Sequence, residues 1–200
     1  MSDHYLFHIR FDVRHDAPAA LHRALTVLSE GNAPTDAELD GLPGIVKDYL
    51  RGNTGAPGDG VHLYWHYGPK RVYRGGELVE APREPHEGSH ALRMTQTFHD
   101  DEYFNGGIYF PYWLFQFAAH DGPVATMQQT NGNELPSVVT KHGDRLIETS
   151  LAYNPDRFWP IGNERPPEQG NPVVIKENRE MSLSETLEGL SVFRDGFAWE

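Results

Sequence analysis

The sequence predicts an α+β fold with a mostly antiparallel sheet of six to eight strands and two or three helices on one face of that sheet. Two observations lead to this prediction. Segments in which apolar and polar residues alternate, as in half-buried strands, recur along the whole chain. Between them lie a few segments with apolar residues at helical spacing, and short turns rich in glycine and proline separate neighbouring strands.

The first strand and the first helix are the clearest elements. A strand is predicted at residues 5–13, where alternate positions are apolar and fall on one face: Tyr5, Phe7, Ile9, Phe11 and Val13. Asp16 precedes Pro18, a pattern that favours Asp16 as the cap of a helix with proline in its first turn. Gly31 follows the apolar positions of that helix and predicts its end.

Further elements follow in order. Thr35 and Glu38 form a capping-box pattern at the start of a second helix, which Pro43 can divide. A short helix with Ser182 as its cap is predicted at residues 182–190. Strands are predicted at residues 61–67, 71–73, 77–81, 91–98, 124–130, 138–142 and 145–153, with an edge strand at residues 173–176.

An aromatic-rich segment is the most unusual stretch of the chain. Between Tyr103 and Phe117, eight of fifteen residues are aromatic, and Pro111 suits the first turn of a helix at residues 110–119. Such a helix is apolar all round and must be covered on every side. Three roles are compatible with it: a core helix, a helix whose outer face closes a homodimer, or the wall of an aromatic ligand pocket. The predicted ligand or interface residues are Tyr109, Tyr112, Trp113 and Phe117.

The domain organisation has two interpretations. The length of 200 residues is compatible with a single α+β domain over residues 1–200. In the alternative, residues 1–82 and 88–200 are two duplicated, ferredoxin-like halves, since a strand leads to His15-Asp16 and a helix in one and to His99-Asp100 and a helix in the other. Few identities support the duplication, so a chance likeness between two amphipathic units explains the pattern equally well.

Composition limits the partners. The chain is acidic, with 29 Asp and Glu against 17 Lys and Arg and a formal net charge of −12, which disfavours nucleic acids and anionic membranes. No cysteine is present, which excludes disulfides and thiolate chemistry. The most apolar segment, residues 108–119, is shorter than the roughly 20 residues that cross a bilayer, and no secretory signal is evident. We therefore expect a cytoplasmic protein.

Two histidine-containing motifs are candidate catalytic or metal sites. His86-Glu87-Gly88-Ser89-His90 matches the H-E-x-x-H zinc pattern, but the flanking Pro85 and the internal Gly88 disfavour the helix that such a site needs, so no metal site is predicted. His62 and His66 share one face of a strand at a spacing of about 13 Å, too far apart to ligate one metal together.

The segment at residues 99–102 holds the predicted catalytic candidates. His99 beside Asp100 and Asp101 has the composition of an acid–base pair or of a carboxylate–imidazole metal site. Capping of a following helix by either aspartate explains the same residues. No phosphate-binding loop, nucleophile elbow or dinucleotide fingerprint is present, and no cofactor is identified.

These observations predict a cytoplasmic binding or interaction protein that forms a homodimer and has no coherent catalytic motif. The alternative is a small-molecule enzyme in which His99 acts as acid or base, Asp100 or Asp101 orients it, and His62 or His66 joins from an adjacent strand. A small-molecule ligand is compatible with both. A third hypothesis is that the acidic surface binds a cationic partner.

Overall fold

The computed structural model describes residues 4–52, 64–69, 71–75, 77–80, 90–99, 108–129, 135–153 and 173–195. Its main sheet has seven antiparallel strands in the order β2-β5-β1-β6-β7-β8-β9. These are β1 (His4–Val13), β2 (Tyr64–Pro69), β5 (His90–His99), β6 (Gly122–Gln129), β7 (Ser137–His142), β8 (Arg145–Tyr153) and β9 (Val173–Ser182). The remaining strands, β3 (Arg71–Arg74) and β4 (Glu77–Glu80), form a separate two-stranded ladder.

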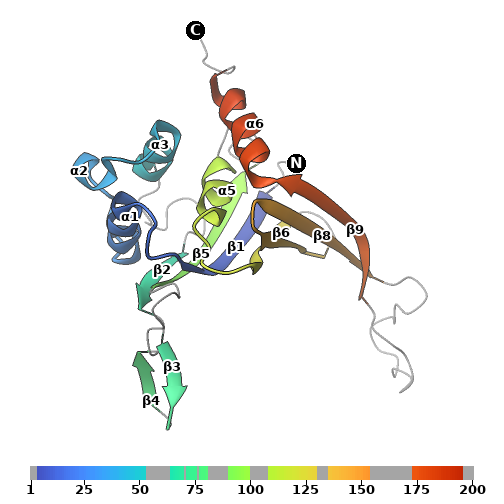
Figure 1. The fold of residues 1–200 in the computed structure, drawn as a ribbon, viewed down its shortest axis with the longest axis horizontal. Helices are drawn as coiled ribbons and strands as arrows, with labels where there is room; N and C mark the ends of the chain where they lie inside the picture. Colours follow the sequence, from blue (N-terminus) through green and yellow to red (C-terminus); the bar gives the residue numbers. More distant parts are fainter. Residues whose placement is uncertain are drawn as a thin grey trace.

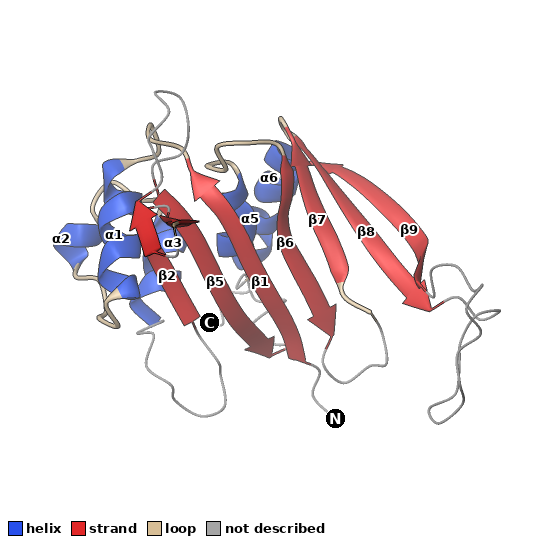
Figure 2. Cartoon of the chain, turned by 90° about the horizontal axis from the view of Figure 1, so that it is seen from below, coloured by secondary structure: helices blue, strands red, loops and turns tan. Residues whose placement is uncertain are grey.

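All five helices of the described residues lie on one face of the main sheet, as the two views in Figure 1 and Figure 2 show together. They are α1 (Ala19–Ser29), α2 (Asp36–Leu39), α3 (Gly44–Gly52), α5 (Tyr109–Phe115) and α6 (Leu183–Asp195). The predicted α+β class, the mostly antiparallel sheet and the one-sided helix layer are therefore confirmed, although the helices are more numerous than the predicted two or three.

The centre of the sheet forms the core through the predicted alternation. Phe7 and Ile9 of β1 are buried against the helices, and Leu92, Met94 and Phe98 of the neighbouring β5 lie on the same face. The rings of Phe7 and Phe98 meet edge to face with centroids 5.6 Å apart. Burial of apolar side chains of this size stabilises the fold by about 1.5–3 kcal/mol each.

The start of α1 differs from the prediction. Pro18 occupies the capping position, no side chain caps the helix, and the helix begins at Ala19. Asp16 instead forms an ion pair with Arg14, with 3.2 Å between carboxylate and guanidinium. The predicted end at Gly31 is confirmed, since Gly31 adopts a φ of +79° that glycine tolerates at no steric cost.

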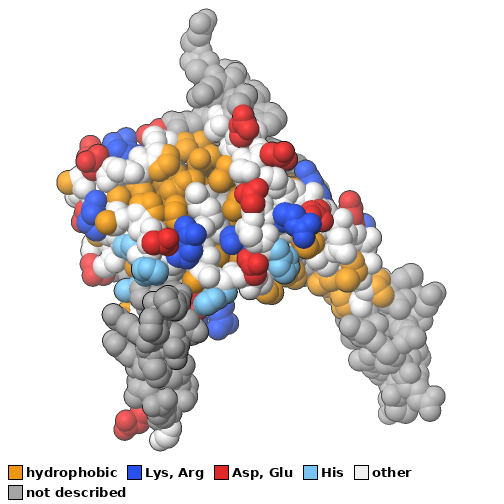
Figure 3. Space-filling view, viewed as in Figure 1, with side chains coloured by type: hydrophobic (Ala, Val, Ile, Leu, Met, Phe, Trp, Pro, Cys, Tyr) orange, Lys and Arg blue, Asp and Glu red, His pale blue; other side chains and the backbone are white. Residues whose placement is uncertain are grey.

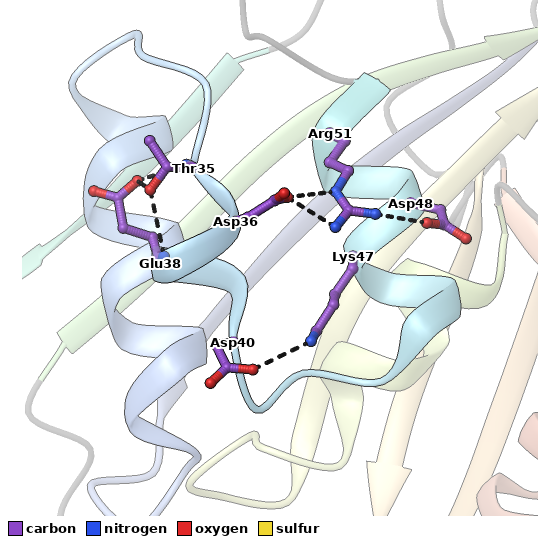
Figure 4. A network of polar contacts seen from close by, with 7 residues as sticks. All are labelled: Thr35, Asp36, Glu38, Asp40, Lys47, Asp48 and Arg51. Atoms are coloured by element: carbon purple, nitrogen blue, oxygen red, sulfur yellow. Dashed lines mark hydrogen bonds and ion pairs between the residues drawn. The ribbon is translucent and has the colours of Figure 1, made fainter.

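The capping box predicted for the second helix is present. Thr35 and Glu38 exchange hydrogen bonds between side chain and backbone at the start of α2. The helical segment is divided, with α2 ending at Leu39 and α3 beginning just after Pro43. Figure 4 shows how charged side chains then join the two helices: Arg51 of α3 binds Asp36 of α2 at 2.8 Å, and Lys47 reaches Asp40, just after α2, at 3.6 Å. Asp48, also on α3, binds Arg51 at 3.2 Å.

The aromatic segment forms α5, which ends at Phe115 rather than at residue 119. Every residue from Phe110 to Phe115 is buried, and Phe110 stacks on Tyr49 of α3 with ring centroids 4.7 Å apart. Both α3 and α6 contact α5 on the side away from the sheet. The prediction of a core helix that is covered all round is therefore confirmed.

The last strands and α6 also follow the predicted pattern. Gly143, with a φ of +60°, lies in the predicted turn between β7 and β8. Strand β9 pairs with β8 and ends the sheet, so it is the predicted edge strand, although it is longer than residues 173–176. Ser182 caps α6 by accepting a hydrogen bond from the backbone N–H of Glu185 at 3.2 Å. Across the described ranges, no helix is long and apolar enough to span a membrane.

Candidate functional site

A cavity of about 490 Å³ lies between α1, α2 and the adjoining ends of β2 and β5. Its size falls within the roughly 300–1,000 Å³ typical of small-molecule sites. The lining combines aromatic, basic and apolar side chains: His15, His22, Arg23, Thr26, Val27, Glu38, Tyr67 and His90. In Figure 3, histidine side chains gather below α1 and beside β2, in the region of these elements.

Local structure explains why these residues converge. His22 and Thr26 lie one turn apart on α1, so they present neighbouring side chains to the same space. Tyr67 of β2 lies opposite Leu92 of β5, and Leu92 is buried on the helix-covered face. His90 is two residues from Leu92 on the same strand, so Tyr67 and His90 both lie on that face. The cavity is therefore formed where the edge of the sheet meets the first helix.

Three rings form the inner wall of this cavity. The hydroxyl of Tyr67 hydrogen-bonds to Nδ1 of His22. Tyr67 also stacks on His90, with centroids 5.0 Å apart and planes inclined by 16°. The rings of His22 and His90 lie 6.2 Å apart. We call Tyr67, His22 and His90 the ring cluster.

Burial sets the protonation of the ring cluster. Tyr67 is only 6% exposed, and desolvation raises the pKa of its hydroxyl, so the phenol keeps its proton. Desolvation also lowers the pKa of His22, and the backbone of His15 opposes this effect to a smaller extent. Nε2 of His22 is shielded from solvent and has no hydrogen-bond partner among the described residues. A protonated phenol and a neutral imidazole can share one hydrogen bond without a buried charge.

The outer part of the cavity is charged. Arg23 is exposed, and its guanidinium makes a 3.4 Å hydrogen bond to the backbone carbonyl of Asp40, which uses one of its five donors. Glu38 is the acidic residue of the lining, and its carboxylate accepts two hydrogen bonds from Thr35, which lower its pKa. The lining therefore contains one guanidinium, three imidazoles and one carboxylate, and this carboxylate already accepts hydrogen bonds from Thr35.

The predicted catalytic residues lie elsewhere. His99 is at the far end of β5, and its ring meets that of His4 edge to face, with centroids 5.2 Å apart. Asp100 and Asp101 lie outside the described residues. His66 is opposite Arg93 on β5, six residues from His99, which corresponds to about 20 Å along the strand. The structure therefore does not bring His66 and His99 together, and His62 lies outside the described residues.

The H-E-x-x-H segment reaches the structure only at His90, because its other four residues lie outside the described part. His90 begins a strand rather than a helix. Within the described part of the chain, no group of three or more histidine, aspartate or glutamate side chains is arranged to hold a metal ion.

The predicted ligand or interface residues belong to the aromatic segment. Tyr112 and Trp113 are each 5% exposed and Phe117 is 7% exposed, and all three belong to the hydrophobic core. Tyr109 is half-buried, and desolvation raises the pKa of its hydroxyl. A role of these four residues in binding a ligand or a partner stays a prediction.

Sequence reasoning missed most of the cavity lining. The sequence pattern puts Tyr67 in a predicted strand and His90 at the end of the rejected metal motif, but neither pattern indicates that the two rings stack. His22 follows Leu21 at the border of the apolar stripe of α1, where polar residues are common. The pairing of β2 with β5 brings the two rings together, and the sequence pattern does not specify which strands pair.

Comparisons with protein-family models, with curated proteins and with solved structures gave no match to this chain.

Proposed function

We propose that this protein is a small-molecule-binding protein whose cavity takes a planar ring that carries a carboxylate. The observation that carries the proposal is the joint presence of the ring cluster and Arg23 around one cavity of about 490 Å³. The stacked rings of Tyr67 and His90 offer an aromatic wall, and Val27 adds apolar contact area. Arg23 and the imidazole of His15 supply hydrogen-bond donors suited to an anionic group.

Charge contrast supports an anionic ligand. The chain as a whole has a formal net charge of −12, yet the lining contains one Arg and three His against one Glu. In this lining Arg23 balances Glu38, so it is less negative than the chain as a whole and offers N–H donors to a small carboxylate. A homodimer and a cytoplasmic location remain part of the proposal, as does the expectation that nucleic acids are not partners.

The enzyme alternative, with His99 and Asp100 or Asp101 as the acid–base pair, stays a prediction. The cavity pairs one hydroxyl with one imidazole, Tyr67 with His22, and desolvation raises the pKa of Tyr67, which makes its hydroxyl a poor nucleophile. Binding is therefore the function that this geometry supports best.

Isothermal titration with three probes tests the proposal. Benzoate provides a ring and a charge, benzamide keeps the ring without the charge, and acetate keeps the charge without the ring. Benzoate is expected to bind more tightly than either of the other probes. Equal or undetectable binding of all three would overturn the proposal.

A matched pair of variants separates the site from the surface. Arg23→Gln is expected to weaken benzoate binding about fivefold, the effect of losing an exposed ion pair of about 1 kcal/mol, and to leave benzamide binding unchanged. Arg93→Gln makes the same charge change at an exposed position on the opposite face of the sheet and is expected to bind benzoate normally. Equal weakening by both variants would show general electrostatics instead of a site.

A further inference from the structure

Strand β9 is the last strand of the main sheet, and no other described strand pairs with its outer edge. Strand β9 has ten residues, pairs with β8 on one side, and is exposed over most of its length. At its start, Val174 is 39% exposed and Ile175 is 61% exposed, and Tyr153 at the end of β8 is 51% exposed. Figure 3 shows hydrophobic side chains gathered at this end of β8 and β9. An exposed edge of this length is a template for pairing with another strand.

The charges of β9 form a pattern that is complementary to itself. Around Asn178, the strand reads Lys176, Glu177, Asn178, Arg179, Glu180. If a second β9 runs antiparallel about a two-fold axis through Asn178, Lys176 lies opposite Glu180 and Glu177 lies opposite Arg179. Each opposite-charge pair occurs twice by symmetry, so four favourable cross-strand pairs form.

Neighbouring registers lack this property. Moving the axis half a residue toward the N-terminus places Lys176 opposite Arg179, and moving it half a residue the other way places Glu177 opposite Glu180. An axis through Glu177 or through Arg179 places that charge opposite itself. Because like charges directly opposite each other destabilise a sheet, the sequence of β9 favours the register centred on Asn178.

We propose that β9 pairs with β9 of a second copy of this chain, which joins the two main sheets across a two-fold axis at Asn178. The interface would give a homodimer through β9 rather than through the aromatic helix, where the sequence predicts it, and it does not depend on the ligand cavity. Charged residues on an edge strand also discourage pairing with unrelated strands. The charges of β9 therefore disfavour other strands and favour a second β9 in this one register.

The local geometry of β9 accommodates this pairing. The register with β8 shifts between Ser150 and Leu151, which leaves Lys176 as an extra residue of β9, whereas pairing is regular from Glu177 to Ser182. Both Glu177–Arg179 pairs therefore lie in the regular part of the strand, whereas each Lys176–Glu180 pair includes the extra residue. Glu180 already binds Arg145 at 2.6 Å through one carboxylate oxygen, and its second oxygen can accept from Lys176 of the second copy.

The chain has no cysteine, so a single introduced thiol reports the register directly. In the proposed dimer, Asn178 lies opposite itself at a Cα separation of about 4.5–5.5 Å, within the range of a disulfide. The variant Asn178→Cys is therefore expected to form a covalent dimer on mild oxidation. Val174→Cys is the matched control, because its two copies would lie about 27 Å apart along the paired strands and should not crosslink.

Charge reversal provides the second arm of the test. Light scattering on the unmodified chain should give twice the chain mass of 22.6 kDa at high micromolar concentration. E177R places Arg opposite Arg179 and is expected to raise the dissociation constant about tenfold, and E177R with R179E should restore the dimer. E188R, which makes the same charge change at an exposed position of α6, should leave the dimer intact.

The outcomes are distinguishable from those of the ligand experiment. A monomer at every concentration, or crosslinking of Val174→Cys as readily as of Asn178→Cys, would overturn the proposed interface. Failure of the double variant to recover, with its thermal unfolding unchanged, would overturn the proposed register. Benzoate binding measured on the same samples decides on the cavity independently.

Discussion

Gln96 is the buried polar side chain of the described core, with only 3% of its surface exposed. Its Oε1 accepts a hydrogen bond from the hydroxyl of Tyr49, which reaches across from α3. The pair fixes where the helix layer sits on the sheet, because an unpaired amide at this depth is costly. The alternation of β5 puts position 96 on the core face, but it does not indicate which group bonds to the buried amide.

Tyr49→Phe is expected to lower the free energy of unfolding by about 1–2 kcal/mol, because Oε1 of Gln96 loses its donor in the core. Tyr49→Phe combined with Gln96→Leu should recover part of this loss, since neither partner is then left unpaired. Urea denaturation of the two single variants and the double variant gives the coupling energy. A strictly additive cycle would contradict the proposed pairing.

His22 predicts a dependence of stability on pH. Burial lowers its pKa from the ordinary value of 6.5, so the unfolded chain binds a proton at His22 at a higher pH than the folded chain does. The contribution of His22 to the free energy of unfolding is therefore fully present above pH 6.5 and is lost as the pH falls through its folded pKa. Chemical denaturation between about pH 7 and pH 5 should show a shallower loss for His22→Gln than for the unmodified chain. Parallel curves would contradict the assignment.

At the scale of elements, the start of a helix can be predicted from its capping residues when the groups that interact are close in sequence. Thr35 and Glu38 are three residues apart, so the capping box can be predicted from the local sequence alone. Asp16 does not cap α1, because Pro18 occupies the capping position and the Asp16 carboxylate forms an ion pair with Arg14. Apart from β9, which extends to Ser182, the predicted strands likewise agree with the structure to within a few residues, since period-two alternation is local.

Thr35→Ala is expected to lower the free energy of unfolding by about 1 kcal/mol, because it removes the side-chain acceptor that caps α2. Glu38 would also lose the hydrogen bond from the Thr35 hydroxyl, which lowers its pKa, and would keep the one from the Thr35 backbone N–H. Thr186→Ala on α6, whose hydroxyl bonds to a backbone carbonyl without capping a helix, is the matched control and should change stability less. Thermal denaturation of the two variants gives the comparison.

At the scale of the whole molecule, strand order is the feature that the sequence does not specify. Strand β1 lies between β5 and β6, which are more than 75 residues further along the chain. Local patterns predict which residues face a core, but the choice of neighbour depends on non-local packing. The cavity could not be predicted for the same reason, since it needs β2 beside β5 under α1.

The two faces of the main sheet differ in chemistry. The helices cover one face, and Figure 2 shows the other without a helix over it. On that open face Arg10 lies directly opposite Arg93, and neither forms an ion pair with a described residue. Like charges in this position are destabilising, so this pair lowers the stability of the β1–β5 ladder.

The central claim is that a ring-bearing carboxylate binds at the ring cluster. The most direct test follows the ring resonances of all 11 histidines by NMR while benzoate is added. The account predicts that His15, His22 and His90 shift together and saturate at one dissociation constant, while His8 on the open face and His142 beside Asp121 stay unchanged. Uniform small shifts of all histidines, or saturable shifts confined to His8 and His142, would contradict it.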